Sequence, residues 1–271
     1  MQLELTDRVI LVTGAGQGIG AGIASAFAQE GARVILNDVN QKSIEEHARE
    51  IEGEGGVSEA VVADISRRHS VQQMVDSIIE RYGRLDVLVN NAGILRRGFV
   101  EEIEEADWNI TLEVNLKGVL NCCQAVIGVM KKQRWGKIIN GASIIARIPD
   151  VGLGAYAVSK SGVVTLTKIL AAELAPYNIN VNAYLPGVVE TPMTDQLISQ
   201  RGEEKLKFIA LRRFARPRDI ANLCLFLASD VSSYITGAVI DISGGNLLVQ
   251  RPWVSFERAA GESQTDQTEQ H

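Results

Sequence analysis

Three side chains in the middle of the chain could together move a proton to or from an alcohol. Tyr156 and Lys160 are four residues apart in an Ala/Val/Ser pattern typical of a helix, so they share one helix face. A phenol has an ordinary pKa of about 10, and a neighbouring ammonium favours its phenolate form. Ser143 follows an apolar run, and its hydroxyl could hydrogen-bond the reacting oxygen. The set predicts acid–base chemistry on a hydroxyl or carbonyl group.

A glycine-rich turn near the N-terminus predicts a phosphate site. It lies between an apolar run and a helical pattern, where backbone N–H groups and a helix N-terminus can hold a phosphate. Glycine has no Cβ, so the backbone can approach a pyrophosphate closely. We expect the turn to bind a dinucleotide through Gly14, Gly16, Gln17, Gly18, Ile19 and Gly20.

Asp38 predicts which dinucleotide binds. A carboxylate at the end of the second expected strand can accept hydrogen bonds from the adenosine ribose and repels a 2′-phosphate. Its neighbours Asn37, Val39 and Asn40 supply no positive charge, and neither does Gln17. The alternative is that Asp38 only caps the next helix. We therefore expect NAD rather than NADP.

Strand and helix patterns alternate along the chain, which predicts an α/β fold. The runs Val9–Val12 and Val87–Val89 are apolar throughout, as parallel strands covered on both faces should be. The alternation predicts a doubly wound, Rossmann-type parallel sheet with helices on both faces. Strands are expected at Val9–Thr13, Arg33–Asn37, Val57–Ala63, Val87–Asn90, Lys137–Ala142, Asn180–Tyr184 and Val239–Ile242. Helices are expected at Ile19–Glu30, Gln41–Gly53, Ser70–Tyr82, Asp107–Gln133, Ala155–Ala175 and Pro217–Ala228.

No linker divides the chain, so a single domain is expected over residues 1–250. Within it, residues 188–213, and Thr191–Arg213 in particular, are expected to form a helical lid over a substrate pocket. A C-terminal extension covers residues 251–271. Its segment Arg251–Arg258 holds Trp253 and Phe256, which we expect to dock on a neighbouring surface. The polar tail Ala259–His271 is expected to be disordered.

Composition excludes several classes of protein. The 271 residues carry a net charge of -6, which disfavours a nucleic-acid or anionic-membrane partner. No apolar run reaches the roughly 18 residues that a membrane span needs. The N-terminus lacks a secretory signal pattern, so we expect a cytoplasmic protein.

The cysteines and histidines predict no metal site. Cys122, Cys123 and Cys224 show no CxxC spacing and are expected as buried small hydrophobic residues in a reducing compartment. The three histidines are scattered without ligand partners and are expected at the surface, at His47, His69 and His271.

These motifs resemble the short-chain dehydrogenase/reductase family over roughly residues 5 to 248. Thr13–Gly20 looks like its cofactor turn, and Asn90–Gly93 looks like its NNAG motif. By this resemblance Ser143 polarises the substrate oxygen, Tyr156 is the general acid/base, and Lys160 binds the ribose and tunes Tyr156. Asn115 matches a fourth catalytic residue, which holds a water in a proton relay.

The resemblance also implies further contacts and an assembly state. The additional cofactor contacts are Asp64, Ile65, Asn91, Ala92, Gly93, Pro186, Gly187, Val189 and Thr191. Members are typically homotetramers in which the two long helices pair, here Asp107–Gln133 and Ala155–Ala175. Because all four catalytic positions are filled, a non-enzymatic NAD-binding scaffold is disfavoured.

The substrate is expected to be a small alcohol or ketone. Arg97 and Arg147 could bind an anionic group, because a guanidinium suits a carboxylate or phosphate. Ile145 and Met193 occupy positions that vary with substrate in the family. The run Ile94–Arg97 resembles gluconate 5-dehydrogenases, and the segment Asn182–Met193 resembles acetoin reductases and butanediol dehydrogenases. A sugar, sugar acid, polyol or small vicinal diol is therefore expected.

Other substrates stay open. The arginines could instead lie on a solvated rim or pair with Glu101, Glu102 or Asp150. A 3-oxoacyl reductase is disfavoured because that group of the family usually uses NADPH. A steroid or other apolar alcohol would suit a pocket lined by Ile144, Ile145, Leu153 and Met193.

Overall fold

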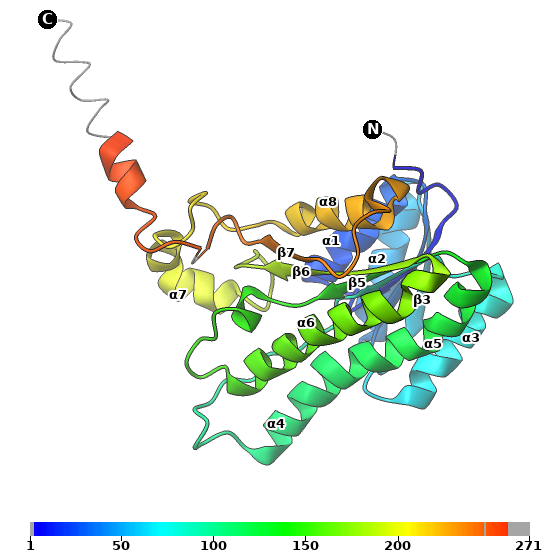
Figure 1. Ribbon diagram of the computed structural model, residues 1–271, viewed down its shortest axis with the longest axis horizontal. Helices are drawn as coiled ribbons and strands as arrows, with labels where there is room; N and C mark the ends of the chain where they lie inside the picture. Colours follow the sequence, from blue (N-terminus) through cyan, green and yellow to red (C-terminus); the bar gives the residue numbers. More distant parts are fainter. Residues whose placement is uncertain (1–2, 247, 260–271) are drawn as a thin grey trace, which may run out of the picture.

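The computed structural model, which describes residues 3–246 and 248–259, is built on one parallel sheet of seven strands. The strand order is β3-β2-β1-β4-β5-β6-β7, so the chain winds outward in both directions from β1 and β4 (Figure 1). This confirms the expected doubly wound α/β fold. The strands are β1 (Val9–Thr13), β2 (Arg33–Asp38), β3 (Val57–Val62), β4 (Val87–Asn90), β5 (Gly136–Gly141), β6 (Ile179–Pro186) and β7 (Val239–Ile242).

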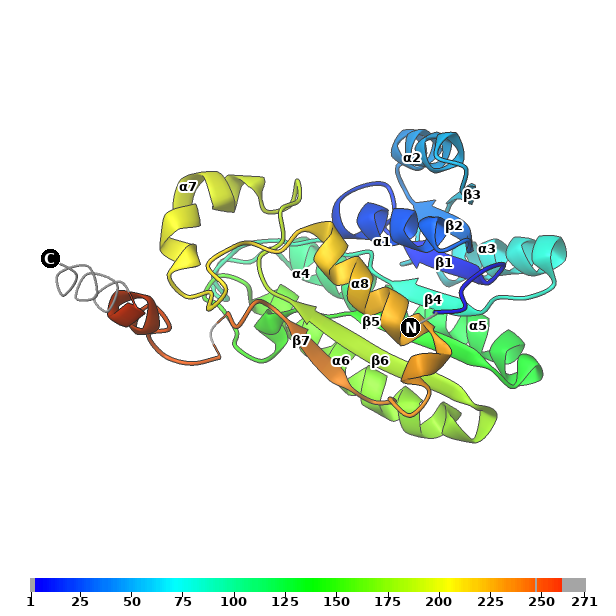
Figure 2. The ribbon, with the colours of Figure 1, turned by 90° about the horizontal axis from the view of Figure 1, so that it is seen from above.

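Helices cover both faces of the sheet, as Figure 2 shows from above. The α-helices are α1 (Gly18–Gln29), α2 (Gln41–Gly53), α3 (Arg68–Tyr82), α4 (Glu105–Leu112), α5 (Gly118–Gln133), α6 (Gly154–Leu174), α7 (Asp195–Leu206) and α8 (Pro217–Ala228). Short 3₁₀ turns lie at Ile144–Ala146, Ala175–Tyr177 and Asp230–Ser232, and residues 254–259 are helical. Helices α1, α2 and α8 pack on one face, and α3, α5 and α6 pack on the other.

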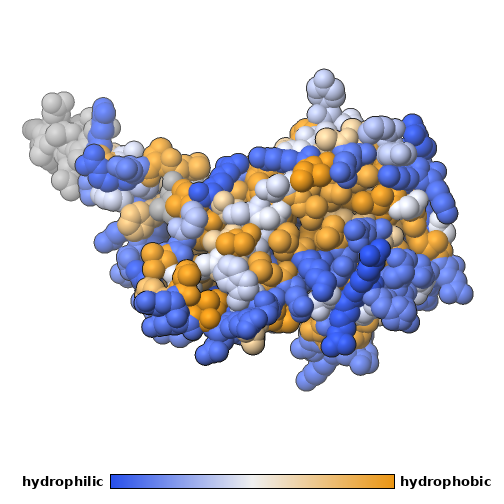
Figure 3. All heavy atoms as spheres, turned by 60° about the horizontal axis from the view of Figure 1, so that its bottom comes forward, coloured by the Kyte–Doolittle hydropathy of each residue, from blue (hydrophilic) through white to orange (hydrophobic). Residues whose placement is uncertain are grey.

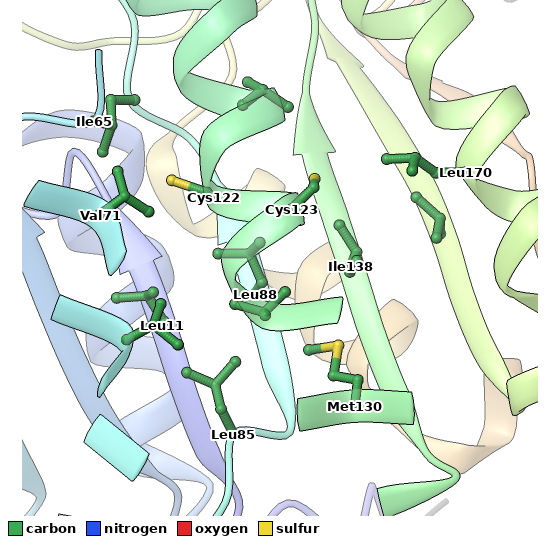
Figure 4. Close-up of a cluster of buried hydrophobic side chains, with 14 of the residues drawn as sticks. Leu11, Ile65, Val71, Leu85, Leu88, Cys122, Cys123, Met130, Ile138 and Leu170 are labelled. Atoms are coloured by element: carbon green, nitrogen blue, oxygen red, sulfur yellow. The ribbon is translucent and has the colours of Figure 1, made fainter. Parts of the chain in front are cut away.

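Alternating side chains of the central strands feed two separate cores. Leu11 of β1 faces α3 and α5, whereas its neighbours Ile10 and Val12 face α1 and α8. All three are fully buried, because a parallel sheet is covered on both faces. Figure 4 shows the first core, with Leu88 of β4 beside Leu11. The apolar runs in the sequence are therefore explained by burial on both sides.

All three cysteines are buried and free. Cys122 and Cys123 lie in the first core (Figure 4), and Cys224 lies in the second. Burial raises the pKa of Cys123 to about 12, so its thiol stays protonated. The prediction of buried hydrophobic cysteines is confirmed.

His47, however, is not a surface residue. It is 7% exposed, its Nε2 lies 2.8 Å from Ser25 Oγ, and its Nδ1 lies 3.0 Å from the Ala15 carbonyl oxygen. The ring thus links α2 to α1 and to the glycine turn. Its partners lie 22 and 32 residues away, so local sequence did not reveal them. His69 is exposed as expected, and His271 lies outside the described residues.

The expected helix Asp107–Gln133 is also not one continuous α-helix. It begins at Glu105 and is interrupted by a π-helical turn, Glu113–Lys117, which separates α4 from α5. A π turn keeps the helical residue pattern while adding a residue, so periodicity alone does not mark it.

The region expected to form a lid contains α7, which stands away from the sheet in Figure 2. After β7, Trp253 packs edge-on against Phe208, with ring centroids 5.6 Å apart. The neighbouring surface is therefore the segment after α7 in the same chain. Of the expected disordered tail Ala259–His271, residues 260–271 lie outside the described residues.

Candidate active site

A cleft of about 360 Å³ opens at the carboxyl edge of the sheet, where parallel strands end and doubly wound folds place their ligands. Its walls come from the glycine turn, from the ends of β2, β4, β5 and β6, and from the first turns of α6. Most of the residues expected to bind the cofactor therefore line one cavity, although they come from distant parts of the sequence. Gly16, Gly20, Gly187 and Val189 are not part of its lining.

The glycine turn is held rigidly against the end of β4. Asn91 Nδ2 donates to the carbonyl oxygens of Thr13 and Gly14, each at 3.1 Å. Thr13 Oγ1 in return accepts from the backbone nitrogens of Asn91 and Ala92. A Cβ added to Gly14 would lie 2.7 Å from Ala92 Cα, and one on Gly20 would collide with the Gly14 carbonyl oxygen. Glycine is required at these positions because a side chain would collide with the neighbouring backbone. The turn leads directly into the N-terminus of α1.

Asp38 faces this turn from the end of β2. Its Oδ2 accepts from Gly16 N at 3.3 Å, and its Oδ1 accepts from Asn40 N at 3.1 Å. It does not cap α2, because Asn40 fills that role by accepting from Ser43 N. The carboxylate lines the cleft, as do the neighbouring side chains of Asn37 and Val39.

Asp64 and Ile65 form the far wall of the same half of the cleft. Burial raises the pKa of Asp64, but hydrogen bonds from Ser66 and Arg67 outweigh it and hold the pKa below its usual value. Ile65 is buried, and its carbonyl oxygen accepts from Asn121 Nδ2 at 2.9 Å. The ionised, fixed carboxylate of Asp64 suits the polar edge of a purine ring, and the apolar side chain of Ile65 suits the face of that ring.

Tyr156 and Lys160 line the other half of the cleft, and Ser143 lies behind Ala142, which does too. Ser143 is the second residue after β5 and hydrogen-bonds Tyr156, which lies in the first turn of α6. Lys160 lies one helical turn further, with Nζ 5.7 Å from the Tyr156 ring centroid. Lys160 Nζ donates to the Gly141 carbonyl oxygen at 2.7 Å. A hydroxyl, a phenol and an amine therefore converge at one point.

Burial controls the protonation of this group. It raises the pKa of Tyr156, and the hydrogen bond with Ser143 lowers that pKa only in part. It also lowers the pKa of Lys160 to about 8. The expected lowering of the Tyr156 pKa is therefore not seen in this structure, because desolvation disfavours the charged forms of both residues.

Asn115 lies in the π-helical turn and is fully buried. Its side chain bonds both backbone groups of Ile94 and donates to Ser159 Oγ at 3.2 Å. A Cβ added to Gly93 would lie 3.3 Å from Asn115 Oδ1 and 3.4 Å from Lys160 Nζ. Gly93 therefore lets the amide and the amine face the same small space.

The segment after β6 closes the cleft. A Cβ added to Gly187 would lie 3.0 Å from Ser243 Cβ, so this glycine lets Pro186–Gly187 pass close to the end of β7. Val189 is buried, and its carbonyl oxygen accepts from both Thr191 Oγ1 and Thr194 Oγ1. Thr191 faces Gly18 across the cleft.

Of the four expected substrate contacts, Met193 lines the cleft. Ile145 is half-buried in the 3₁₀ turn after Ser143, and Arg97 is exposed on the loop after β4. Arg147 points toward β7 instead, where it donates to the Val239 carbonyl oxygen at 2.8 Å and pairs with Asp241 at 3.8 Å. The expectation that Arg147 faces the substrate is corrected, because its charge is engaged there.

Sequence reasoning missed Tyr184, a fully buried residue of β6 that also lines the cleft. Its hydroxyl donates to Asn91 Oδ1 at 3.1 Å and so completes the bonds that hold the glycine turn. The only signal in the sequence was a polar atom on a residue in an otherwise buried strand. Ile94, Val114 and Pro192 line the cleft as well.

Within residues 3–246 and 248–259, no three acidic, histidine or cysteine side chains gather as metal ligands would. None of the helices in that part of the chain has the length and apolar character that a bilayer crossing needs.

Comparison with known proteins places the chain in a family. A family model described as enoyl-(acyl carrier protein) reductase matches residues 14–246. The 3-oxoacyl-[acyl-carrier-protein] reductase of Thermotoga maritima is 44% identical over 243 residues, which cover 90% of this chain and 99% of that protein. A subunit of (2S)-[(R)-hydroxy(phenyl)methyl]succinyl-CoA dehydrogenase from Thauera aromatica is 40% identical, over 91% of this chain and 99% of that subunit.

Solved structures agree. One is described as an NAD(P)-dependent gluconate 5-dehydrogenase from Beutenbergia cavernae with NADP bound at low occupancy. It is 37% identical and superposes with a TM-score of 0.88 over 92% of this chain and 100% of its own. Levodione reductase is 33% identical, with a TM-score of 0.85 over 89% of this chain and 97% of its own. With this fold, this cleft and these relatives, the chain belongs to the short-chain dehydrogenase/reductase family of oxidoreductases.

Proposed function

We propose that this protein is an NAD-dependent dehydrogenase that interconverts a secondary alcohol and its ketone. The observation that carries the proposal is the convergence of Ser143, Tyr156 and Lys160 at one end of a cleft whose other end holds the glycine turn and Asp38. A bound nicotinamide cofactor would supply or accept the hydride. The remaining chemistry is a single proton transfer at the substrate oxygen.

Each residue of the convergent group has one task in that transfer. Tyr156 takes the hydroxyl proton in the oxidation direction and returns it in the reduction direction. Ser143 donates a hydrogen bond to the substrate oxygen, where negative charge develops. Lys160, when protonated, favours the phenolate of Tyr156 and lies where it can bind a ribose hydroxyl. Asn115 fixes the turn beside Lys160 and can hold a water for proton exchange.

The fit of a dinucleotide is supported by the cradle around it. The turn is packed so closely that added Cβ atoms at Gly14 and Gly20 would collide with backbone atoms, and it leads directly into the N-terminus of α1. Of the additional contacts, Asp64 and Ile65 for the adenine and Thr191 for the carboxamide line the cleft. Val189, the other contact proposed for the carboxamide, is buried beside Thr191.

The preference for NAD rests on Asp38. One carboxylate oxygen accepts from Gly16 N in the glycine turn and the other from Asn40 N in the loop after β2, so the charge is fixed where a ribose hydroxyl would bind. A 2′-phosphate at that point would meet this negative charge. The relative from Beutenbergia cavernae is described with NADP bound, so the proposal of NAD for this chain rests on Asp38 and not on the relatives.

For the substrate we propose a sugar, sugar acid, polyol or small vicinal diol. Arg97 supports an acidic group on that substrate, because its guanidinium is exposed on the loop that follows Gly93. The described likeness to a gluconate 5-dehydrogenase supports the same class.

The second candidate is a 3-oxoacyl thioester or its 3-hydroxy form. It is favoured by the names of the two relatives above and by the engagement of Arg147 with Asp241. Exposed apolar side chains on the loops before α4 and α6, at Phe99, Val100, Ile148 and Val151, would suit a longer apolar chain.

A substrate panel tests these proposals together. NADH formation is measured with polyols, aldoses, sugar acids, vicinal diols and 3-hydroxyacyl thioesters, with NADP in parallel. Turnover with NAD on a hydroxylated small molecule would support the first candidate, and turnover on thioesters alone would support the second. Preference for NADP would contradict the role of Asp38, and absence of turnover on every secondary alcohol would contradict the proposed reaction.

We also propose a homotetramer that buries the outer face of α5 and α6. Val158 and Ile169 of α6 are each about half exposed, and apolar residues gather on the face seen in Figure 3. Light scattering after size-exclusion chromatography measures the assembly state, and a monomer at micromolar concentration would contradict it.

A further inference from the structure

The lid helix α7 is weakly held by its own packing. None of the residues Asp195–Leu206, all of them described, is buried, and the backbone leaves helical geometry at Arg201. The segment that leads into α7 includes Thr191 and Met193, which line the cleft. A helix without a buried face gains little stability from tertiary contacts, so the position of this lid depends on what holds its ends.

The segment after α7 connects the lid to the sheet. Ile209 is buried, and Leu211 N donates to the Gly244 carbonyl oxygen at 3.0 Å. Phe208 and Arg212 flank these two residues and contact Trp253 and Phe256 of the C-terminal extension. The lid therefore ends in a short hinge, which we define as residues 207–213. Two side chains of this hinge, Phe208 and Arg212, contact the C-terminal extension.

The contacting part of the extension is the C-terminal strap, which we define as residues 251–259. Arg251 adopts a left-handed conformation with φ 53°, which turns the chain, and Pro252 is buried. Trp253 then meets Phe208 edge to face, with an interplanar angle of 86°. The Arg212 guanidinium lies 4.7 Å from the centre of the Phe256 ring. In Figure 1 the strap is the red helix beyond α7.

The strap is a stronger tie on the lid than its ion pair with the loop before α6. That ion pair joins Lys205 Nζ and Asp150 Oδ2, at 3.9 Å between partly exposed side chains. An exposed pair at that distance contributes little, whereas an aromatic edge-to-face contact is partly desolvated and directional. Loss of the strap would thus leave α7 tied mainly through its hinge.

The strap also lies outside the part of the chain that the family shares. The family model ends at residue 246, and the Thermotoga maritima relative is covered to 99% by 90% of this chain. The contacts that residues 251–259 make with the lid are therefore a property of this chain rather than of the shared domain.

We propose that Trp253 and Phe256 are positioning residues that hold α7 over the substrate end of the cleft, through Phe208 and Arg212. The strap sets how often the lid opens, and through the lid it sets the affinity for substrate. The part of this proposal that concerns substrate affinity rests on the proposed function, whereas the part that concerns lid position does not.

Limited proteolysis of the full chain tests lid position without any substrate. The lid and hinge carry trypsin sites at Arg201, Lys205, Lys207, Arg212 and Arg213. Because cleavage follows the population of the open form, Trp253→Ala should speed cleavage at these sites by about threefold to tenfold, the shift that one aromatic pair supports. Cleavage elsewhere, for example at Arg81, should be unchanged.

Two further variants keep the test decisive. Trp253→Phe retains an aromatic ring and should stay within about twofold of the wild type, while Phe208→Leu removes the partner ring and should repeat the effect of Trp253→Ala. Tyr234→Ala, which removes a fully exposed aromatic ring remote from the lid, is the matched control. Unchanged lid cleavage in both Trp253→Ala and Phe208→Leu would overturn the proposal.

Kinetics then separate positioning from simple loss of structure. With a substrate in hand, Trp253→Ala should raise KM for that substrate by about threefold to tenfold while kcat and the Kd for NADH stay within about twofold. A fall in kcat with unchanged KM would overturn the proposal. If no substrate is turned over, the proposed function fails, yet the proteolysis result still decides the role of the strap.

Discussion

The side chain of Asn115 pairs with both backbone groups of Ile94. Its Oδ1 accepts from Ile94 N at 2.8 Å, and its Nδ2 donates to Ile94 O at 2.9 Å. Beyond the end of β4, the backbone groups of Ile94 pair with no neighbouring strand in the described part of the chain. The buried amide of Asn115, in the π-helical turn, pairs with them instead. The same amide lies beside Gly93 and Lys160, so the loop after β4 and the amine of the cleft are positioned by one side chain.

Asn115→Ala should therefore reduce both stability and turnover. Leaving the Ile94 backbone groups unpaired in a buried place should lower the free energy of unfolding by about 1–3 kcal/mol, measured by urea denaturation. Turnover should fall by at least about tenfold at saturating substrate. Asn180→Ala is the control, because Asn180 also donates to two carbonyl oxygens but lies far from the cleft. Equal turnover in the two variants would contradict a role for Asn115 in the reaction.

Tyr156→Phe removes the proposed acid and base while keeping the ring. We expect kcat to fall by about 10²–10⁴ because a positioned proton donor contributes that much. NADH binding, followed by fluorescence titration, should change by less than about twofold. Tyr177→Phe, at a partly exposed tyrosine distant from the cleft, should leave kcat unaltered. Residual turnover close to the wild type would rule out Tyr156 as the proton carrier.

The reaction should depend on pH in opposite senses for its two directions. Burial raises the pKa of Tyr156, so its base form is scarce at neutral pH and increases as pH rises. Burial lowers the pKa of Lys160 to about 8, so the ammonium that favours the phenolate is lost above that pH. For oxidation, kcat/KM should thus climb from about pH 6 to about pH 8 and then level off. Ketone reduction, which needs the protonated phenol and the ammonium, should stay level up to about pH 8 and decline above it, and a flat oxidation profile would disprove this assignment.

Cofactor choice can be reversed at two positions. Asp38→Ser combined with Val39→Arg removes the fixed carboxylate and adds a cation for a 2′-phosphate. The ratio of kcat/KM for NADP over NAD should rise by at least about 100-fold. Val39→Arg alone is the control, because it adds the cation but keeps the carboxylate, and its ratio should rise much less. Persistent preference for NAD in the double variant would show that Asp38 does not select the cofactor.

The two arginines provide a matched pair for the substrate. Arg97→Ala should raise KM for an acidic sugar by about tenfold or more, as loss of a charge-assisted contact would. Arg147→Ala should not, because that guanidinium is bound to Val239 and Asp241. An unchanged KM in Arg97→Ala would exclude this residue from substrate binding.

The fold was predictable because its signals are local. Continuous apolar strands such as β1 and a helical repeat such as α8 can be recognised from a few neighbouring residues, and their bounds match the structure. The approximate place of the cleft also followed, since parallel strands end at one edge.

Side-chain direction was harder to predict because its causes are distant in sequence. Arg147 turns toward β7 for partners 92 and 94 positions away, and His47 is buried by the glycine turn. The docking partner of Trp253 likewise lies 45 positions earlier, at Phe208. No window of neighbouring residues contains these pairs.

The π-helical turn sets the orientation of Asn115 relative to the buried face of α5. One extra residue rotates everything downstream by about 100°, the angle between successive residues of an α-helix. Asn115 can face Ile94 and Gly93 while Cys122, Cys123 and Val126 of α5 face the core only because that rotation occurs between them. A deletion of one residue within Glu113–Lys117 would therefore turn the apolar stripe of α5 toward solvent. Chain length is thus constrained at this helix as strictly as residue identity is.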